Sequence, residues 1–321
     1  MKIISRDNFA ANSAEWLKEY HAKYYAMYSS VFAGITTDPT MMLVPVDDHL
    51  VHRGDGVFES LKCVDGCLYN LEDHLLRLRN SATSLNLGGH YTDEQIKELT
   101  IAAVRAGGHH NCSVRIIISR GPGSFAVNPY DCPVPQLYII VTYLPPPFMQ
   151  IHPEGARVCR SSIRAKPAFM AGIKNCNYLP NVLMKKEAID LGIDLTVAFD
   201  AQDCMGEGPT ENLGIVTNER RLIFPPLDNI LRGTTMTRVM ALARGLVPDQ
   251  LLSVESAAIR EADIAEATEM LIVGTTWNVA AVREYNGKAV GNGTPGPVFK
   301  MLYKLLDDDI HNNQALRTPA L

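Results

Sequence analysis

The sequence lacks the features that mark secreted, membrane-spanning or nucleic-acid-binding proteins. Its first residues, MKIISRDNFAANSAEW, include charges and no continuous apolar stretch, so they do not resemble a signal peptide. No apolar run approaches the roughly 18 residues that cross a bilayer. The net charge of -5 argues against nucleic acid or an anionic membrane surface as a partner. We therefore expect a soluble protein of the cytoplasm.

Cysteines are few and irregularly spaced. The seven stand at positions 63, 67, 112, 132, 159, 176 and 204. Cys63 and Cys67 form a C-x₃-C pair, but no second pair lies at a matching distance, which does not fit a zinc site. An odd number of scattered cysteines predicts reduced thiols and no bound metal.

The chain is long enough for two domains, each with its own core. Strand-like runs outnumber those of a βαβ ladder, which favours an α+β fold. Three consecutive prolines at 145–147 form a stiff break, and we place the domain boundary there. We predict an N-terminal extension plus small domain over 1–145, a linker over 146–152 and a larger domain over 153–321.

Several elements have clear local signals. Asp65-Gly66 between two strand-like runs predicts a β-hairpin. Thr92, followed by Gln95, predicts the capped start of a helix. We also expect a helix over 13–30, a strand over 41–48 and a helix from about Pro180.

The stretch FMAGIKNCNYLPNVLMKKEA, residues 169–188, holds an unexpected lysine. Lys185 and Lys186 fall where the expected helix meets water, but Lys174 stands just before that helix, where the macrodipole disfavours a cation. A lysine with a chemical role most often forms a Schiff base, and burial or a neighbouring positive charge must then keep its amine unprotonated. A solvated surface charge is the alternative for Lys174, as for most lysines.

Pyridoxal phosphate is an electron-sink cofactor that needs such a lysine, a carboxylate at its ring nitrogen and anchors for its phosphate. Glu207, in a Gly-Glu-Gly-Pro turn before a strand, is a candidate for the carboxylate, although alone it is typical of an exposed turn. Residues 233–235 (GTT) open a helix, and residues 274–276 (GTT) end a strand; both suit a phosphate. Each signal is weak alone, and the set is more specific than its members.

Taken in order, these motifs resemble those of the class IV aminotransferases. They are Lys174-x-x-Asn177-Tyr178-Leu179, Glu207-Gly208-x-x-x-Asn212-Leu213, Leu231-x-Gly233-x-Thr235 and Gly274-Thr275. The resemblance covers about residues 29–306 and includes HRGDGVFESLKCVDGCLYNLEDHLLRLRNSA in the N-terminal half. It is closest to plant-type D-amino acid aminotransferases and lyases, which share strings such as NYLPNVL. It implies the two-domain fold-type IV architecture of D-amino acid aminotransferase, with a small N-terminal α/β domain, pyridoxal 5′-phosphate as cofactor and a homodimer.

The resemblance also assigns roles by position. Lys174 is implied to hold the cofactor covalently and move a proton, Glu207 to pair with the ring nitrogen, and Tyr178 to lie near the phenolic oxygen. Arg77 is implied to bind the phosphate through charge-assisted hydrogen bonds, with a solvated helix arginine as the alternative. The remaining implied cofactor positions are Leu231, Thr234, Thr235 and Thr275.

On the substrate side, the resemblance implies roles for Phe58, Arg115, Thr276 and Trp277. Arg115 alternates with Val114 and Ile116 along a strand and fits either a substrate carboxylate or a structural ion pair. The string RGPGSFAVNP replaces the Arg-x-His carboxylate trap of the bacillus-type enzymes. Glu59 stands where lyases commonly have threonine, which favours transamination.

The predicted function is exchange of an amino group between an amino acid, of D-amino acid or branched-chain type, and a 2-oxo acid, by a ping-pong Schiff-base mechanism. One alternative is aminodeoxychorismate lyase, which releases p-aminobenzoate and pyruvate with the same cofactor. The other is a non-catalytic paralogue that binds pyridoxal phosphate; the complete set of cofactor residues argues against it.

Overall fold

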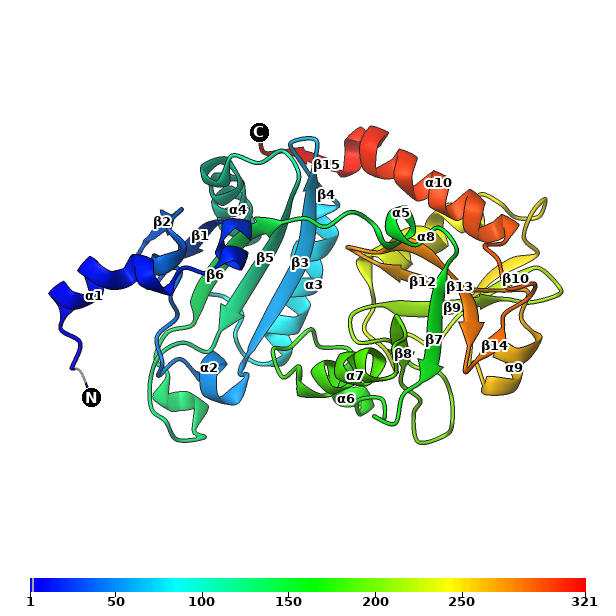
Figure 1. The fold of residues 1–321 in the computed structure, drawn as a ribbon, viewed down its shortest axis with the longest axis horizontal. Coiled ribbons are helices and arrows are strands. Elements are labelled where there is room, and N and C mark those ends of the chain that lie inside the picture. Colours follow the sequence, from blue (N-terminus) through cyan, green and yellow to red (C-terminus); the bar gives the residue numbers. More distant parts are fainter. Residues whose placement is uncertain (2) are drawn as a thin grey trace. The chain divides into compact units, whose positions relative to one another are not determined.

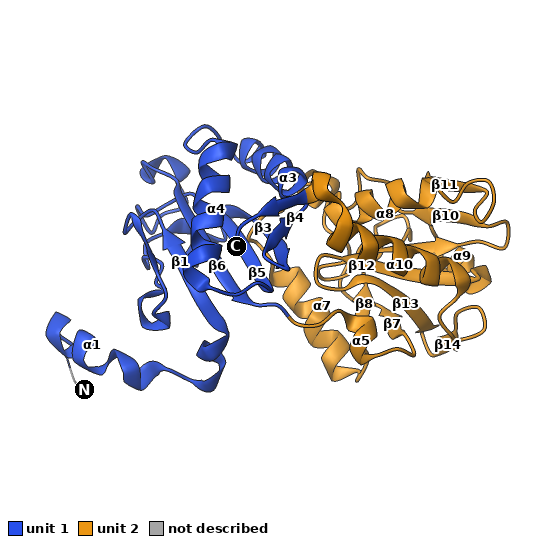
Figure 2. Cartoon of the chain, turned by 90° about the horizontal axis from the view of Figure 1, so that it is seen from above, with its two compact units in different colours: residues 1–144, 317–321 blue, residues 145–316 orange. Residues whose placement is uncertain are grey.

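The computed structural model describes residue 1 and residues 3–321. The chain forms two compact units, coloured separately in Figure 2: unit 1 contains residues 1–144 and 317–321, and unit 2 contains residues 145–316. The chain leaves unit 1 after Leu144 and returns to it after Leu316, so the C-terminal residues fold with the N-terminal part.

Unit 1 is built on a seven-stranded antiparallel sheet with the order β15-β4-β3-β5-β6-β1-β2 (Figure 1). Along β5, Val114 and Ile116 are buried while Arg115 between them is exposed, because successive side chains point to opposite faces. The strands are β1 (Tyr24–Ser29), β2 (Gly34–Thr36), β3 (Gly56–Val64), β4 (Cys67–Tyr69), β5 (Cys112–Ser119), β6 (Gln136–Tyr143) and β15 (Arg317–Pro319).

Two long helices cover this sheet. Helix α3 (Leu71–Ser84) packs on β3, and α4 (Asp93–Gly107) packs on β1 and β6. The predicted capping box of α4 is confirmed: the Gln95 amide donates to the Thr92 hydroxyl, and the Thr92 amide donates to the Gln95 side chain. The shorter helical elements of unit 1 are α1 (Arg6–Asn12), η1 (Ser13–Trp16), η2 (Glu19–Lys23), η3 (Pro39–Met41), α2 (His49–Arg53) and η4 (Pro129–Asp131).

Two expectations near the N-terminus are wrong. Residues 24–29, expected inside a helix, form β1 between β2 and β6, because tyrosines favour a half-buried strand and neighbouring strands are present to pair with. Residues 41–48, expected as a strand, contain no strand and end at Asp48, which caps α2. Pro45 in this stretch has no N–H to contribute to a ladder.

The Asp65-Gly66 hairpin is confirmed. Both residues have positive φ, 50° and 75°, as a two-residue turn between twisted strands requires. The C-terminal strand β15 pairs with the outer side of β4, and the Gly66 carbonyl accepts hydrogen bonds from the amides of Ala320 (2.8 Å) and Leu321 (3.0 Å). The end of the chain thus covers the hairpin.

Unit 2 contains an eight-stranded mixed sheet with the order β11-β10-β9-β12-β13-β7-β8, and β14 beside β13. The pairs β10–β11, β13–β7 and β7–β8 are parallel, and the other pairs are antiparallel. The strands are β7 (Ala156–Arg160), β8 (Leu195–Val197), β9 (Asn212–Val216), β10 (Arg221–Phe224), β11 (Ser253–Ser256), β12 (Glu269–Gly274), β13 (Asn278–Tyr285) and β14 (Lys288–Ala289).

The helices of unit 2 surround this sheet. Helices α8 (Thr234–Arg244) and α10 (Pro297–Asn312) pack on each other and on β12, and α7 (Leu179–Asp190) packs on β8. The helix expected from about Pro180 is confirmed as α7. The helical elements are α5 (Phe148–Ile151), α6 (Ala168–Ala171), α7 (Leu179–Asp190), α8 (Thr234–Arg244), α9 (Glu261–Glu266), α10 (Pro297–Asn312) and η5 (Gln314–Leu316).

The division into units differs from the predicted domain limits in two places. Residues 146–152, expected as a linker, include α5 and belong to unit 2. Residues 317–321, expected in the larger domain, belong to unit 1 because β15 pairs with β4. A strand as short as β15 shows no clear periodicity, so the sequence does not predict that the chain returns to unit 1.

Within residue 1 and residues 3–321, no helix combines the length and the apolar character needed to cross a bilayer. The same part of the chain contains no group of three or more His, Cys, Asp or Glu side chains placed to hold a metal ion. All seven cysteines are free thiols.

Candidate active site

Lys174 lies in an irregular segment between α6 and α7 of unit 2. Its side chain is buried, 8% exposed, and its Nζ lies 5.9 Å from the centroid of the Tyr178 ring. Tyr178 is the N-cap residue of α7, and its amide donates to the Cys176 carbonyl at 2.9 Å. Asn175 accepts a hydrogen bond from the Asn177 amide at 3.0 Å. The amide-rich turn therefore fixes a buried amine beside the helix start, as a reactive lysine requires.

Glu207 lies just before β9, in the turn that the sequence singled out. Its Oε2 accepts a hydrogen bond from the Leu231 amide at 3.0 Å, and its backbone carbonyl accepts one from the Ala198 amide at 3.0 Å. The carboxylate is therefore held against the segment that leads into α8. This fixed position is compatible with the predicted contact to a ring nitrogen.

The N-terminus of α8 has the features of a phosphate seat. Its N-cap residue Gly233 provides no side-chain cap, and the first turn carries no acidic residue. The first amides of a helix have no acceptor within the helix, and the helix dipole favours an anion there. Thr234, in this turn, is 6% exposed, and Thr235 is half-buried.

Gly233 is a glycine because of a close approach. A Cβ at this position would overlap Oδ1 of Asn212, the first residue of β9. The Asn212 side chain is itself fixed, since its Nδ2 donates to the Leu231 carbonyl at 3.0 Å. These contacts hold the start of β9 against the start of α8.

Thr275, Thr276 and Trp277 form the turn between β12 and β13, where Gly274 pairs with Asn278. Since β9 and β12 are antiparallel and Asn212 pairs with Val273, this turn lies at the end of the sheet where β9 begins. All three turn residues are half-buried. The structure therefore brings the predicted positions in segments 207–212, 231–235 and 275–277 to one end of the unit 2 sheet.

Sequence reasoning missed two side chains in this part of unit 2, Phe148 and Lys166, and the structure adds the burial of a third, Glu211. Phe148 of α5 stacks on Trp277, with centroids 4.2 Å apart and planes 8° apart. Glu211 is 6% exposed, and burial raises its pKa against the opposing effects of Thr210, Lys185 and Lys174. Lys166 places its Nζ 4.7 Å from the centroid of the Tyr178 ring. No pattern marks Phe148 or Lys166, because the contacts that matter are made across the fold.

We call Lys166, Lys174, Tyr178, Glu207 and Glu211 the Lys174 region. Burial lowers the pKa of Lys166, and the carboxylate of Glu207 opposes that effect. Lys166 makes no hydrogen bond or ion pair with another residue that the structure describes. The region thus combines two amines at one aromatic ring with two carboxylates near them.

Arg77, the predicted phosphate ligand, belongs to unit 1. Its Nε and Nη2 each donate to Glu59 at 2.7 Å, and the His74 Nδ1 lies 2.7 Å from the same carboxylate. Burial alone would raise the pKa of Glu59, which is 0% exposed, but Arg77 and His74 lower it to about 2. We call these three residues the Glu59 cluster. Arg77 is therefore not a simple solvated arginine, and its phosphate contact stays a prediction.

Phe58 and Arg115, predicted on the substrate side, lie on neighbouring strands of unit 1. Residues 58 and 60 point to the sheet face opposite Glu59, and Arg115 pairs with Ser60. The Arg115 guanidinium lies over the Phe58 ring, 5.5 Å from its centroid. Arg115 makes no ion pair with another described residue, so the structural ion pair considered for it is not found there.

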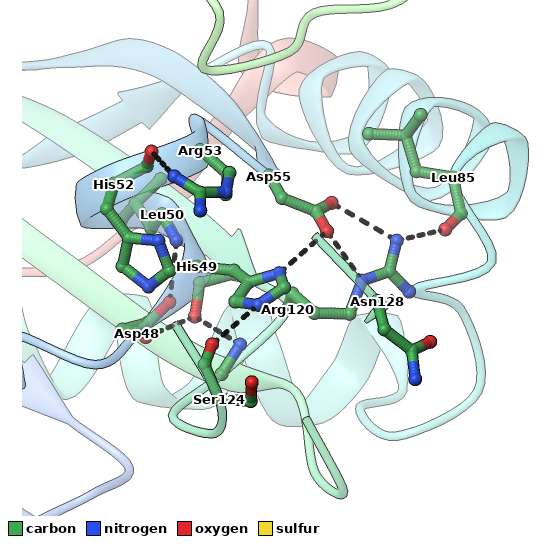
Figure 3. A network of polar contacts seen from close by, with 12 residues as sticks. Asp48, His49, Leu50, His52, Arg53, Asp55, Leu85, Arg120, Ser124 and Asn128 are labelled. Atoms are coloured by element: carbon green, nitrogen blue, oxygen red, sulfur yellow. Dashed lines mark hydrogen bonds and ion pairs between the residues drawn. The ribbon is translucent and has the colours of Figure 1, made fainter. Parts of the chain in front are cut away.

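A polar network organises the stretch before β3 (Figure 3). The buried Asp48 accepts hydrogen bonds from Ser119 (2.7 Å) and Tyr138 (2.8 Å). Arg120 makes a two-fold contact with Asp55 at 2.9 and 3.1 Å and also donates to the Leu85 carbonyl at 2.7 Å. Arg120, the arginine that begins RGPGSFAVNP, is thus engaged within unit 1 by Asp55 and the Leu85 carbonyl.

Comparison with known proteins places these observations in a family. The family model described as amino-transferase class IV matches residues 56–285. The D-amino-acid transaminase, chloroplastic, of Arabidopsis thaliana is 37% identical over 292 residues, which cover 90% of this chain and 78% of that protein. A putative branched-chain-amino-acid aminotransferase of Methanocaldococcus jannaschii is 29% identical over 267 residues, covering 83% of this chain and 90% of that protein.

Solved structures agree with the fold. The branched-chain aminotransferase of Thermoproteus uzoniensis, solved with norvaline, superposes with a TM-score of 0.83 at 22% identity, covering 93% of this chain and 100% of that one. The branched-chain amino acid aminotransferase of Thermobaculum terrenum in its PLP-bound holo-form gives a TM-score of 0.81 at 20% identity, covering 93% of this chain and 99% of that one. The similarity covers residues of both units, and it shows the fold alone.

Proposed function

Because this chain belongs to the class IV aminotransferases, an enzyme family that uses pyridoxal 5′-phosphate, we propose that it transfers amino groups between an amino acid of D-amino acid or branched-chain type and a 2-oxo acid. The observation that carries the proposal is the grouping of a buried lysine, a fixed carboxylate and an uncapped helix start in one unit. These are the parts that the cofactor requires.

The residues of unit 2 fit the cofactor. Gly233 leaves the start of α8 without a side-chain cap, so its first turn can receive the phosphate. Leu231, Thr234, Thr235 and Thr275 are the proposed phosphate-side residues, and Arg77 is proposed to join them on the basis of the family resemblance. Glu207 would hold the ring nitrogen, and Tyr178 would hold the phenolic oxygen. When bound, pyridoxal phosphate accepts the amino group and delocalises the electrons left at the deprotonated carbon.

The chain's own groups then have separate tasks. Lys174 would bind the cofactor through its amine and would carry a proton between the substrate Cα and C4′ of the cofactor during amino transfer. Glu207 would keep a negative charge beside the ring nitrogen, and the Leu231 amide holds that carboxylate in place. Since donor and acceptor use the same groups in turn, the kinetics should be ping-pong.

Substrate recognition is proposed for Phe58, Arg115, Thr276 and Trp277. Support comes from the half-buried turn that contains Thr276 and Trp277, and from Arg115, whose guanidinium lies over Phe58 without an ion pair to a described residue. The named D-amino-acid and branched-chain relatives support transamination over lyase chemistry.

We further propose a homodimer. Support comes from the loop between β5 and β6, where Phe125 is 61%, Val127 77% and Tyr130 91% exposed. Such apolar exposure is typical of an interaction surface. A cytoplasmic location stays a prediction, and the chloroplastic location in the name of the Arabidopsis relative concerns that protein. Light scattering on the purified enzyme tests the dimer; a monomeric mass would contradict it.

The central test is a half-reaction. The purified enzyme with its cofactor is mixed with a panel of D- and L-amino acids without an acceptor, and the absorbance change of the cofactor is recorded. A change with D-amino acids or branched-chain L-amino acids, reversed by pyruvate or 2-oxoglutarate, is expected. No change with any amino acid, or p-aminobenzoate from aminodeoxychorismate as the main product, would contradict the proposal.

A further inference from the structure

A reactive lysine must be unprotonated, so its surroundings must disfavour the charged amine. The structure places a second amine close to the same aromatic ring as Lys174. Two amines approach one aromatic ring: the Lys166 Nζ lies 4.7 Å and the Lys174 Nζ 5.9 Å from the centroid of Tyr178. A cation near another cation disfavours the second charge. Burial acts on Lys174 in the same direction, since only 8% of it is exposed.

We propose that Lys166 is a positioning residue for Lys174: its ammonium, held over the Tyr178 ring that Lys174 also faces, disfavours a proton on the Lys174 amine and keeps that amine ready to bind the cofactor. The inference rests on the proposed function, because it concerns the lysine that would carry the cofactor. It adds a role for a residue that sequence reasoning did not select.

Tyr178 explains how an ammonium is held at this place. Lys166 lies in the segment after β7 and makes no hydrogen bond or ion pair with another described residue, so its recorded contact is with the face of the ring. The electron-rich face of an aromatic ring attracts a cation, and the attraction is stronger where water is partly excluded. A charge held in this way has not been neutralised by a carboxylate at hydrogen-bond distance.

Other charged groups near the two amines also influence their protonation, some favouring the charged form and some opposing it. Burial lowers the pKa of Lys166 and so works against its ammonium form, whereas the carboxylate of Glu207 and the face of the Tyr178 ring favour that form. Glu211 and Lys174 interact, and a carboxylate there favours a proton on Lys174; however, burial raises the pKa of Glu211 and so favours its neutral form. The charged and titratable groups linked by these interactions are Lys166, Lys174, Tyr178, Lys185, Glu207 and Glu211.

The experiment measures the proton affinity of Lys174 directly. In the full-length protein freed of cofactor, the rate of acetylation of Lys174 is followed against pH by mass spectrometry. Lys166→Met, which keeps length but removes charge, is expected to raise the midpoint for Lys174 by about one pH unit. Lys166→Arg, whose charge is permanent, is expected to keep the midpoint at or below the wild-type value. Lys186→Met is the matched control, because Lys186 pairs with Asp190 on the exposed side of α7.

A second reading uses the holoenzyme. The pH at which its cofactor absorbance changes should move in the same order among the three variants and the wild type. An unchanged Lys174 midpoint in Lys166→Met would overturn the inference, as would equal midpoints in Lys166→Met and Lys166→Arg that both differ from wild type. If Lys166→Met does not fold, Lys166→Gln replaces it with the same expected shift.

The acetylation measurement distinguishes failure of this inference from failure of the proposed function. The acetylation experiment needs no substrate, so it reports on the amine pair even if the wild-type enzyme gives no half-reaction. Conversely, a wild-type half-reaction with amino acids, together with an unchanged Lys174 midpoint in Lys166→Met, would support the proposed function and overturn only the role of Lys166.

Discussion

Two regions of the molecule differ in how they hold charge: a fully buried carboxylate is paired in one, and a half-buried amine has no ion pair with a described residue in the other. In the Glu59 cluster of unit 1, the carboxylate is 0% exposed and is bonded by both Arg77 and His74. In the Lys174 region of unit 2, Lys166 lies over an aromatic ring with no ion pair to another described residue. A paired buried charge fixes structure, whereas an uncompensated one stays responsive to ligands and protons. The difference indicates a fixed framework in the first region and reactive groups in the second.

The strongest test of this comparison is removal of the amine itself. Lys174→Ala should abolish turnover, because the covalent attachment and the proton transfer both depend on it. Borohydride reduction of the wild-type holoenzyme should fix the pyridoxyl group on Lys174, as mapped by mass spectrometry. Lys186→Ala should retain full activity. A label found on Lys166 would show that the reactive amine of the Lys174 region has been misassigned.

The next largest effect is expected from the carboxylate held by the Leu231 amide. Glu207→Gln keeps size and hydrogen bonding but removes the charge that favours a protonated ring nitrogen. The rate of transamination should fall at least about 10²-fold, equivalent to roughly 2.7 kcal/mol of transition-state stabilisation, with cofactor still bound. Glu211→Gln should lose less, since its carboxylate takes hydrogen bonds from Thr210. Near-normal turnover in Glu207→Gln at full cofactor occupancy would count against its role.

The sequence predicted the local elements that carry the candidate residues of unit 2, because short motifs mark those elements. The lysine before α7, the glutamate before β9 and the glycine before α8 are each tied to a local turn or helix start, which sequence patterns reveal. Long central strands and capped helices were also predictable, since each has its own periodicity or cap.

What the sequence did not reveal depends on contacts across the fold. The local pattern of residues 24–29 predicts a helix, but the pairing of β1 with β6 outweighs that pattern. The return of β15 to unit 1 depends on one pairing far along the chain. Lys166 and Phe148 gained significance only when Tyr178 and Trp277 were placed beside them.

In the Glu59 cluster, loss of charge should affect stability. Glu59→Gln removes the carboxylate that neutralises Arg77 and His74 and should destabilise unit 1 by about 3 kcal/mol at neutral pH. The pKa of Glu59 falls from 4.5 to about 2 in the fold, so its contribution is complete above pH 4.5 and is lost as the pH falls toward 2. The difference between wild type and variant should therefore shrink at acid pH.

Hydrogen exchange followed by mass spectrometry checks this prediction locally. Peptides from β3 and α3 should exchange faster in Glu59→Gln, while peptides from β9 and β12 of unit 2 serve as the internal reference. Equal acceleration in both units, or no acceleration in β3, would show that the paired charge does not stabilise unit 1 in the way proposed.

A smaller effect is expected at the proposed phosphate seat, the start of α8, where Gly233 and Asn212 approach closely. In Gly233→Ala the added Cβ would overlap the Asn212 Oδ1, so the start of α8 must shift. Cofactor affinity should fall by about tenfold, the loss of one charge-assisted hydrogen bond. Gly172→Ala is the matched control, because nothing lies within 4 Å of a Cβ there. Equal affinity in the two variants would remove α8 from the proposed phosphate seat.

The smallest effect concerns which side chains the enzyme accepts. Phe148 stacks on Trp277 at 4.2 Å and on His152 at 4.6 Å, so the indole is held by a row of rings within unit 2. Phe148→Leu keeps an apolar side chain but removes the stack, worth about 1 kcal/mol. Trp277 should then move more freely, and kcat/KM for bulky amino acids should rise several-fold relative to alanine, consistent with the modest energies that distinguish apolar side chains.

Tryptophan fluorescence in a Trp16→Phe background, where Trp277 is the reporter, should change in the same variant without substrate. If the fluorescence changes but the order of substrates does not, the stack positions the indole away from the bound side chain, and Trp277 is not the residue that limits substrate size.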